Sequence, residues 1–490
     1  MASPSMPLRS FINGKRVRPS PQHLYSLYDA ATGTVREKVQ SATPGQIRDG
    51  VIAASESQER WARDYSPSDR SKVLLRAARI LERRAGEVAL AETGDTGRTV
   101  RETRHEAAGA ADCLEYQAGA ALTVGGQHVD LSGNRSWGYT RREPIGTTVG
   151  IGAWNYPLQS AVWKSAPALA FGNSMVFKPS ELTPTTALIL ADAYSEAGLP
   201  DGVFNVILGD GSAGASLVSH EKVDKVSFTG SVETGSKVYT AAAESLKRVT
   251  LELGGKSPLI IFDDANIHDA VSTAMVANWL SSGQVCSNGT RVFVHESVLE
   301  KFLESLVKRT SRLKIGDPTE EATDLGPMIS RGHMEKVMKY IQIGKEEDQA
   351  DLLCGGEPIL QETGGYYLSP AIFSNCNDNM RIVQDEIFGM VMSVLSFRDE
   401  GEVVQRANNT AYGLAAGVFT NDLKRAHRVV ADLNVATTWI NNYNLAPVVL
   451  PWGGFKKSGQ GSENGLVGVE SWTRLKAVYV EMGAIDCPYP

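Results

Sequence analysis

Short apolar segments alternate with helical segments between residues 174 and 253, and this alternation constrains the fold more than any other feature of the sequence. Four segments have the length and composition of buried strands, at 174–177, 204–208, 223–228 and 249–253. Helical patterns separate them, including one at 232–244. Strands that alternate with helices favour parallel βαβ units, so we predict an α/β fold with a Rossmann-like parallel sheet.

Helix boundaries are marked in three places. Thr43 precedes Pro44, and Thr183 precedes Pro184. Threonine is a favoured N-cap and proline fits the first helical position, so we expect helices that begin at these two prolines. A third helix is expected over 266–282, where Gly283 would end it.

Polar and glycine-rich motifs follow three of the predicted strands. They are KPSE at 178–181, FTGSVETG at 228–235 and ELGGK at 252–256. Because ligands of parallel sheets bind at the carboxyl ends of strands, this clustering predicts a cofactor site. Gly230 and Gly235 could admit a phosphate at a helix start, but a tight turn explains them equally well. Ser236-Lys237 follows instead of the lysine-serine order of a nucleoside triphosphate site, which disfavours that ligand.

Two residues have surroundings suited to catalysis. Cys286 lies in the loop sequence GQVCSNG, where flanking glycines leave room for a substrate and for backbone N–H donors. Glu252 ends an apolar strand, and burial could raise its pKa to that of a general base. The alternatives are an inert buried thiol, which is our interpretation of the other four cysteines, and a solvated strand-end carboxylate.

The composition excludes several classes of partner. A net charge of −7 gives no reason to expect nucleic acid or an anionic membrane surface. Five irregularly spaced cysteines with no CxxC or HExxH motif disfavour a disulfide framework and a metal site, and fit a reducing, cytoplasmic location. The most apolar stretch, 147–172, contains Asn155 and Lys164 and is expected to line a site rather than span a membrane. The first eight residues are expected to form a loose tail without a secretory signal.

Six motifs in this order and spacing resemble the aldehyde dehydrogenase superfamily, over about residues 11–482. They are WNYPL, FKPSELTP, FTGS, ELGGK, GQVCSNGTR and EIFG. The resemblance implies a cofactor domain at 1–120 and 143–254 and an α/β catalytic domain at 255–455. It also implies a small β oligomerisation element with the C-terminal tail at 121–142 and 456–490. An edge strand near Tyr479 and Glu481 would extend a neighbour's sheet, which implies a homodimer or homotetramer.

The resemblance also implies a mechanism. Cys286 would attack the aldehyde, Asn155 and the backbone N–H of Cys286 would stabilise the oxyanion, and Glu252 would activate water to hydrolyse a thioester. The cofactor would be NAD. The residues that would bind it are Lys178, Glu181, Gly230, Ser231, Gly235, Glu386 and Phe388. Since a carboxylate such as Glu181 accepts hydrogen bonds from ribose hydroxyls and repels an added phosphate, NAD should be preferred to NADP.

Three segments carry a closer likeness within the superfamily, namely GAWNYPLQSAVWKSAPALA, SSGQVCSNGTRVFV and WINNYN…PWGGFKKSG…ENG. They most resemble betaine aldehyde and 4-trimethylaminobutyraldehyde dehydrogenases. The similarity implies an aromatic pocket for a quaternary ammonium group, formed by Tyr156, Trp163 and Trp439, with Trp279 as a further member. Ordinary core packing is the alternative for all four rings. Lys164 and Glu463 match a proposed charge-relay pair, for which a structural ion pair is the alternative.

Three other functions are open to a chain of this kind. The enzyme could oxidise general aliphatic or aromatic aldehydes, if the aromatic residues serve only for packing. It could pass the thioester to coenzyme A, although Glu252 favours hydrolysis. It could be a silent structural relative, which the presence of all the expected catalytic residues disfavours.

Overall fold

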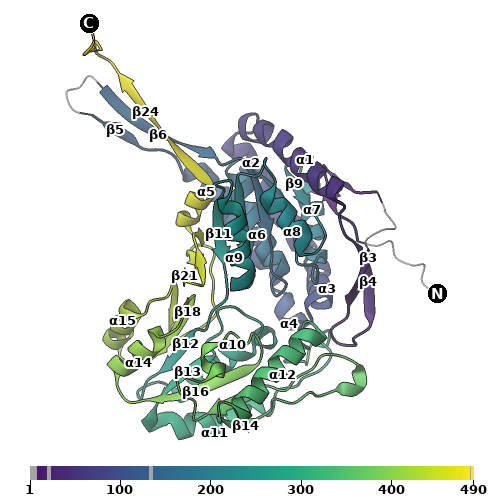
Figure 1. The fold of residues 1–490 in the computed structure, drawn as a ribbon, viewed down its shortest axis with the longest axis vertical. Helices are drawn as coiled ribbons and strands as arrows, with labels where there is room; N and C mark the ends of the chain where they lie inside the picture. The colour runs from purple at the N-terminus through teal and green to yellow at the C-terminus, as the bar shows by residue number, and fades with distance from the viewer. Residues whose placement is uncertain (1–7, 19–23, 132–135, 486) are drawn as a thin grey trace.

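The computed structural model describes residues 8–18, 24–131, 136–485 and 487–490, so most of the predicted N-terminal tail, residues 1–7, lies outside the described residues. The chain forms two α/β units, one above the other in Figure 1, and a narrow arm that projects from the upper unit. Each unit is built on its own large sheet. No helix in the described part of the chain is long and apolar enough to cross a membrane.

The upper unit contains an eight-stranded sheet in the order β2-β1-β9-β8-β7-β10-β11-β22. Its strands are β1 (Phe11–Ile12), β2 (Lys15–Arg16), β7 (Thr147–Ile151), β8 (Ser174–Lys178), β9 (Phe204–Val206), β10 (Lys225–Thr229), β11 (Arg248–Glu252) and β22 (Gly459–Gln460). The five strands from β9 to β11 are parallel, which confirms the predicted α/β class. β22 comes from the C-terminal region, which was expected to belong to the oligomerisation element, and pairs with β11.

Helices cover both faces of this sheet. The helices are α1 (Pro44–Arg63), α2 (Pro67–Arg83), α3 (Ala85–Thr96), α4 (Val100–Thr103), α5 (Glu106–Thr123), α6 (Pro157–Ala170), α7 (Thr185–Glu196), α8 (Gly211–Ser219) and α9 (Val232–Ala243). One apolar core joins α1, α8 and α9 to the sheet, and a second joins it to α2, α5, α6 and α7. Figure 1 shows α8 and α9 on one face of the strands.

The two predicted threonine-proline starts behave differently. α1 begins at Pro44 with Thr43 as its N-cap, as predicted, and the structure adds a capping box between Thr43 and Gln46. α7 begins one residue later than predicted, because Pro184 is itself the N-cap and Thr183 forms no cap. The buried carboxylate of Asp95 on α3 instead accepts hydrogen bonds from the backbone N–H and the hydroxyl of Thr185. Because Asp95 on α3 already accepts the free N–H at the start of α7, a cap from Thr183 is not needed.

The lower unit contains a seven-stranded sheet in the order β14-β15-β16-β13-β12-β18-β19. Its strands are β12 (Pro258–Ile261), β13 (Arg291–His295), β14 (Asp351–Cys354), β15 (Ala371–Ser374), β16 (Val391–Phe397), β18 (Ala415–Phe419) and β19 (Thr437–Ile440). Its main helices are α10 (Ile267–Trp279), α11 (Leu299–Thr310), α12 (Arg331–Glu346), α14 (Glu400–Asn408) and α15 (Leu423–Asp432). The strands lie inside the range expected for the catalytic domain.

The predicted helix at 266–282 was too long. α10 ends at Trp279, and Ser281 and Ser282 then adopt left-handed backbone angles, with φ of 51° and 54°. Apolar periodicity could not reveal this, because the turn depends on partners elsewhere in the chain.

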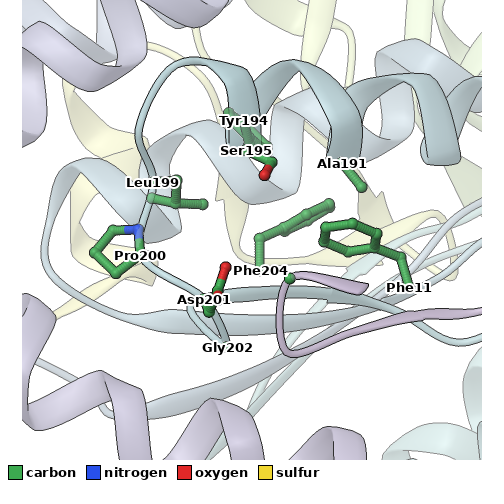
Figure 2. A pocket seen from close by; sticks show the side chains of 10 residues that line it. Phe11, Ala191, Tyr194, Ser195, Leu199, Pro200, Asp201, Gly202 and Phe204 are labelled. Carbon is green, nitrogen blue, oxygen red and sulfur yellow. The ribbon is translucent and has the colours of Figure 1, made fainter. Parts of the chain in front are cut away.

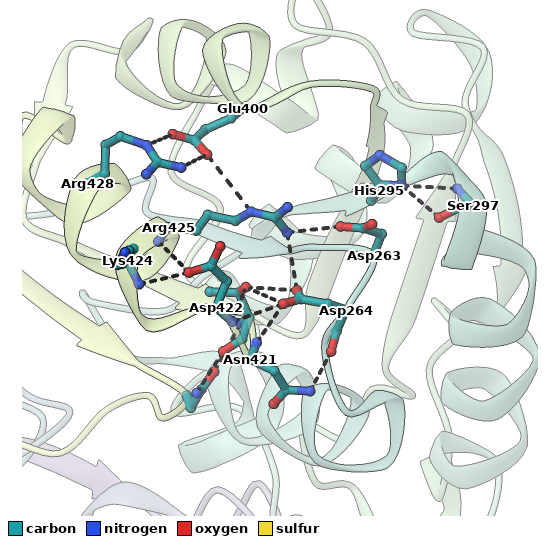
Figure 3. Close-up of polar contacts among 12 residues, drawn as sticks. Asp263, Asp264, His295, Ser297, Glu400, Asn421, Asp422, Lys424, Arg425 and Arg428 are labelled. Carbon is teal, nitrogen blue, oxygen red and sulfur yellow. Dashed lines mark hydrogen bonds and ion pairs between the residues drawn. The ribbon is translucent and has the colours of Figure 1, made fainter.

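A polar network fastens α15 to the end of β12 (Figure 3). The carboxylate of Asp264 accepts hydrogen bonds from the hydroxyl of Thr420 and from the backbone N–H groups of Asn421 and Asp422. Arg425 reaches Asp263 at 3.0 Å and Asp264 at 3.3 Å. The network thus joins the end of β12 to the start of α15 within the lower unit.

The projecting arm is a three-stranded antiparallel sheet in the order β24-β6-β5. Its strands are β5 (His128–Asp130), β6 (Ser136–Pro144) and β24 (Thr473–Glu481). Among the residues that the structure describes, β24 pairs with β6 alone, which confirms the edge strand predicted around Tyr479. Figure 1 shows the arm extending away from both units, with the C-terminus near its tip.

Candidate active site

The predicted nucleophile and base come together where the chain passes from β11 to β12. Glu252 ends β11, and Gly254 and Gly255 follow it. A Cβ on Gly255 would lie 2.8 Å from the backbone oxygen of Cys286, and one on Gly254 would overlap the carboxylate of Glu386. The glycines of ELGGK therefore allow three loops, which are far apart in the sequence, to touch one another.

Asn155 fastens its own loop to the Cys286 loop. It lies between β7 and α6, and its side-chain amide donates to the backbone oxygen of Gln284 at 2.9 Å. Gln284 in turn accepts the N–H of Ile329 and donates to the oxygen of Ser281. Since an amide nitrogen carries two hydrogens, this bond fixes the group while its second N–H stays available to an oxyanion.

The surroundings of Cys286 disfavour the thiolate form of its side chain. Burial raises its pKa to about 12, and the carboxylates of Glu386 and Glu252 add to this effect. A thiol becomes a good nucleophile only as the thiolate, so a base or a nearby positive charge is needed for reaction.

Glu252 has the environment of a proton acceptor. Its side chain is 4% exposed, and among the described residues neither carboxylate oxygen has a hydrogen-bond partner. Burial raises its pKa well above the ordinary value, the negative charge of Glu463 raises it further, and Lys164 opposes the shift. An unpaired carboxylate with a raised pKa can take a proton from water near neutral pH.

Lys164 and Glu463 form a buried ion pair close enough to influence Glu252. Lys164 Nζ lies 2.5 Å from Glu463 Oε1, and the side chains are 0% and 2% exposed. Lys164 also donates to the hydroxyl of Thr229, and Glu463 accepts from the hydroxyl of Ser227.

Three tryptophans and a tyrosine form a continuous row. Trp163 lies 6.0 Å from Trp452, Trp452 lies 6.4 Å from Trp439, and Trp439 lies 4.6 Å from Tyr443, measured between ring centres. Sequence reasoning missed Trp452, although the motif PWGG that contains it was one of those that carried the subfamily likeness. Trp452 is the cross-strand neighbour of Glu463, so the row also contacts the strand of the buried ion pair.

The other two predicted pocket residues are not part of this row. Tyr156 has the guanidinium of Arg98 on one ring face, 3.9 Å from the ring centre. Trp279 lies in the core of the lower unit, 3% exposed, and donates to the hydroxyl of Thr310 on α11. The structure therefore places Trp279 in the core, because Trp279 lies on the side of α10 that packs against α11.

The predicted cofactor residues lie at the expected strand and helix ends. Lys178 ends β8, donates to the oxygen of Pro179 and lies 3.7 Å from Glu181, and burial lowers its pKa. Glu181 is 47% exposed, so its carboxylate can accept a ligand. Ser231 is the N-cap of α9 and accepts from the N–H of Thr234.

Packing is sufficient to explain the two glycines of FTGSVETG. A Cβ on Gly235 would lie 2.5 Å from the side chain of Leu253, and one on Gly230 would lie 2.6 Å from the ring of Phe228. Close packing therefore accounts for glycine at both positions, whereas neither has the positive φ that a glycine-requiring tight turn would show.

The EIFG loop meets the Cys286 loop. Glu386 accepts the N–H of Gly255 at 3.1 Å. Phe388 has a left-handed φ of 64°, its oxygen accepts from His333 Nε2 at 2.7 Å, and its ring packs edge-on against Trp154. A large residue in this backbone region is strained, and such strain is common at functional sites.

A hollow elsewhere in the upper unit is not part of this site (Figure 2). It lies beside β9 and α7 and is lined by residues that include Phe11, Tyr194 and Phe204. None of the predicted catalytic residues lines it. We therefore place the candidate active site at the three touching loops.

Comparison with known proteins agrees with this geometry. The sequence model of the aldehyde dehydrogenase family matches residues 17–478, and the chain therefore belongs to this family. It is 52% identical to betaine aldehyde dehydrogenase of Mesorhizobium japonicum over 482 residues, which cover 98% of each chain. It is 51% identical to betaine aldehyde dehydrogenase of Brucella anthropi over 483 residues, covering 98% of this chain and 97% of the relative.

Solved structures give the same fold. Betaine aldehyde dehydrogenase of Staphylococcus aureus in complex with NAD+ superposes with a TM-score of 0.96 at 35% identity, covering 99% of this chain and 97% of that one. An NAD-dependent aldehyde dehydrogenase of Sinorhizobium meliloti gives 0.97 at 35% identity, with the same coverage. The predicted family and fold are thus confirmed, and the chain is an oxidoreductase that acts on aldehydes.

Proposed function

We propose that this enzyme uses NAD to oxidise betaine aldehyde, or a closely related quaternary-ammonium aldehyde such as 4-trimethylaminobutyraldehyde, to the carboxylic acid. The observation that carries the chemistry is the contact of the Gly255 turn with Cys286, beside the buried, unpaired carboxyl of Glu252. The substrate class rests on the row of aromatic rings and on the identity to betaine aldehyde dehydrogenases.

The residues at the site account for each step. The thiol of Cys286 first gives its proton to water. The resulting thiolate adds to the aldehyde carbon, and the free N–H of the Asn155 amide, with the backbone N–H of Cys286, stabilises the oxyanion. One such donor contributes about 2.7–4 kcal/mol to transition-state stabilisation. Loss of hydride leaves a thioester on Cys286. Glu252 then takes a proton from water, which hydrolyses the thioester and frees the acid.

The residues present fit NAD as the hydride acceptor. The exposed carboxylate of Glu181 suits the hydroxyls of the adenosine ribose, and the start of α9 at Ser231 suits the pyrophosphate. Glu386, held by Gly255, would bind the nicotinamide ribose. Bound NAD supplies an acceptor for hydride, and positive charge near Cys286 would lower the pKa of its thiol.

The aromatic row suits a quaternary ammonium group. Such a group cannot donate a hydrogen bond, and aromatic faces bind it at about 0.5–2 kcal/mol per contact. Trp163 and Trp439 are the members predicted from sequence, and Trp452 lies between them. The indole N–H of Trp439 donates to the oxygen of Leu445, which fixes the orientation of its ring.

The test is NADH formation with four aldehydes at equal concentration: betaine aldehyde, 4-trimethylaminobutyraldehyde, 3-aminopropionaldehyde and hexanal. We expect a quaternary-ammonium substrate to exceed hexanal in kcat/KM by at least tenfold, about 1.4 kcal/mol in the transition state. A higher kcat/KM for hexanal would refute the proposed substrate class and leave the Cys286 chemistry intact. Inactivity with all four aldehydes would refute both the substrate class and the chemistry.

We also propose that the enzyme is a cytoplasmic homodimer or homotetramer. The exposed edge of β24 supports this, because an edge strand can extend a sheet of a second copy. Light scattering on the purified enzyme should give a mass of two or four chains. A single-chain mass would refute the assembly.

A further inference from the structure

Four side chains from three segments form a closed ring of contacts beside the Cys286 loop. The guanidinium of Arg98 lies on the ring of Tyr156, 3.9 Å from its centre. The hydroxyl of Tyr156 is 2.8 Å from the hydroxyl of Ser281, which lies 2.9 Å from Glu102 Oε2. Glu102 closes the ring by accepting from Arg98 Nε at 3.4 Å. None of the four has been assigned a catalytic step above.

Burial makes this ring of contacts rigid. The side chain of Arg98 is 4% exposed, and besides Glu102 it pairs with Glu106 at 2.7 Å and Glu92 at 3.5 Å. Burial alone would lower the pKa of Arg98, but the surrounding carboxylates raise it, so the guanidinium stays charged. Because a buried charge without partners is costly, Arg98 and Glu102 hold each other in place.

The closed ring of contacts fixes the strained turn that leads to Cys286. Ser281 has a left-handed backbone, and its N–H donates to Glu102 Oε1 at 3.1 Å. Glu102 therefore receives both the backbone N–H and the hydroxyl of Ser281. A serine adopts this backbone readily only when its surroundings impose it.

The same ring also fixes the oxyanion donor. Tyr156 follows Asn155 directly, and Asn155 donates to Gln284, two residues before Cys286. The relative positions of the nucleophile Cys286 and the oxyanion donor Asn155 thus depend on one group of contacts. An error of about 1 Å in such an alignment can reduce the rate of reaction about a hundredfold.

We propose that Glu102 and Ser281 are positioning residues, which align the Cys286 loop with Asn155. This inference rests on the roles proposed above for Cys286 and Asn155. VRET, the segment that carries Glu102, has no feature in the sequence that marks it, because its partners lie about 180 residues away.

The decisive variant is Ser281→Gly, with Ser282→Gly as its matched control. Glycine adopts a left-handed backbone without strain and each change removes one buried, hydrogen-bonded hydroxyl, so the melting temperature should fall slightly and by a similar amount in both variants. Both variants lose a hydroxyl, but the hydroxyl of Ser282 donates to the backbone oxygen of Gly326 and takes no part in the closed ring of contacts. We expect Ser281→Gly to lower kcat at least tenfold with betaine aldehyde and with hexanal, and Ser282→Gly to change it less than threefold.

Two further measurements separate positioning from stability. The rate at which iodoacetamide alkylates Cys286 should change in Ser281→Gly and not in Ser282→Gly. Glu102→Gln retains an acceptor for the Ser281 N–H, so it should keep at least threefold more kcat than Glu102→Ala. Equal kcat and alkylation rates in folded wild-type and Ser281→Gly enzyme would overturn the proposal. Activity in Cys286→Ser would instead overturn the assignment of the nucleophile.

Discussion

Replacing Glu463 by glutamine tests whether the buried pair with Lys164 tunes the base Glu252. The change preserves shape and leaves groups able to bond to Lys164 and Ser227, but it removes one negative charge. Lys164, 0% exposed, is then a buried cation without a charged partner. The pair therefore predicts effects on both stability and pH dependence.

The effect on stability follows from burial. Removing one partner of a buried ion pair costs about 3–5 kcal/mol. With an unfolding entropy of about 2.1 cal/mol/K per residue, a chain of this length has about 1 kcal/mol/K, so the melting temperature should fall by about 3–5 °C. Glu233→Gln is the matched control, since its pair with Lys237 is exposed and such pairs contribute about 0–1 kcal/mol.

The effect on catalysis has a defined sign. Burial raises the pKa of Glu252 most, Glu463 raises it further and Lys164 lowers it. Glu463→Gln removes the negative charge that raises the pKa of Glu252 and leaves the positive charge of Lys164, which lowers it. The pKa of Glu252 should therefore fall. As a base works only when unprotonated, the acid limb of the kcat profile should move to lower pH in the variant.

The assay is kcat against pH at saturating aldehyde and NAD, for wild type, Glu463→Gln and Glu233→Gln. Single-turnover measurements of thioester hydrolysis should show the same shift, because Glu252 acts in that step. An acid limb that stays in place, with only the melting temperature lowered, would mean that the pair is purely structural. A limb that moves to higher pH would contradict the electrostatic reasoning.

Four further variants test individual residues. Glu252→Gln should form NADH in a burst of one equivalent and then turn over about 10²–10⁴ times more slowly, because hydrolysis loses its base; steady turnover without a burst would contradict this role. Asn155→Ala should lower kcat about 10²–10³-fold, and an unchanged kcat would remove it from the oxyanion site. Glu181→Ser should improve kcat/KM for NADP relative to NAD, and an unchanged ratio would mean that Glu181 does not determine the preference for NAD. Trp439→Ala should raise KM for betaine aldehyde more than for hexanal, and equal losses would indicate simple packing.

The fold could be predicted from sequence where short-range signals decide it. Apolar segments between helices gave the parallel strands, and the threonine-proline pair at 43–44 gave the start of α1. The start of α7 was misplaced because Asp95, about ninety residues away, caps it. α10 was predicted too long because Glu102 imposes the turn at Ser281. Both errors arise from contacts between distant segments.

The same division applies to the site. Cys286, Glu252 and Asn155 stand in motifs that can be recognised, and the structure brings their loops together. Arg98 and Glu102 could not be found, because an arginine in the loop between two helices and a glutamate in a short helix normally face solvent. Trp279 was expected near the substrate because it lies seven residues before Cys286, but the helix directs it into the core.

The glycines of the three touching loops explain why their motifs occur together. A Cβ on Gly283 would overlap the backbone of Gly389 in EIFG, and one on Gly254 would overlap Glu386. A Cβ on Gly255 would lie 2.8 Å from the backbone oxygen of Cys286, which is also closer than real Cβ contacts allow. Each glycine is thus required by a neighbour in another motif, and a side chain at any one position would push two loops apart. ELGGK, GQVC and EIFG therefore form one packing unit, in which the base, the nucleophile and the cofactor carboxylate keep their spacing because backbone packs against backbone.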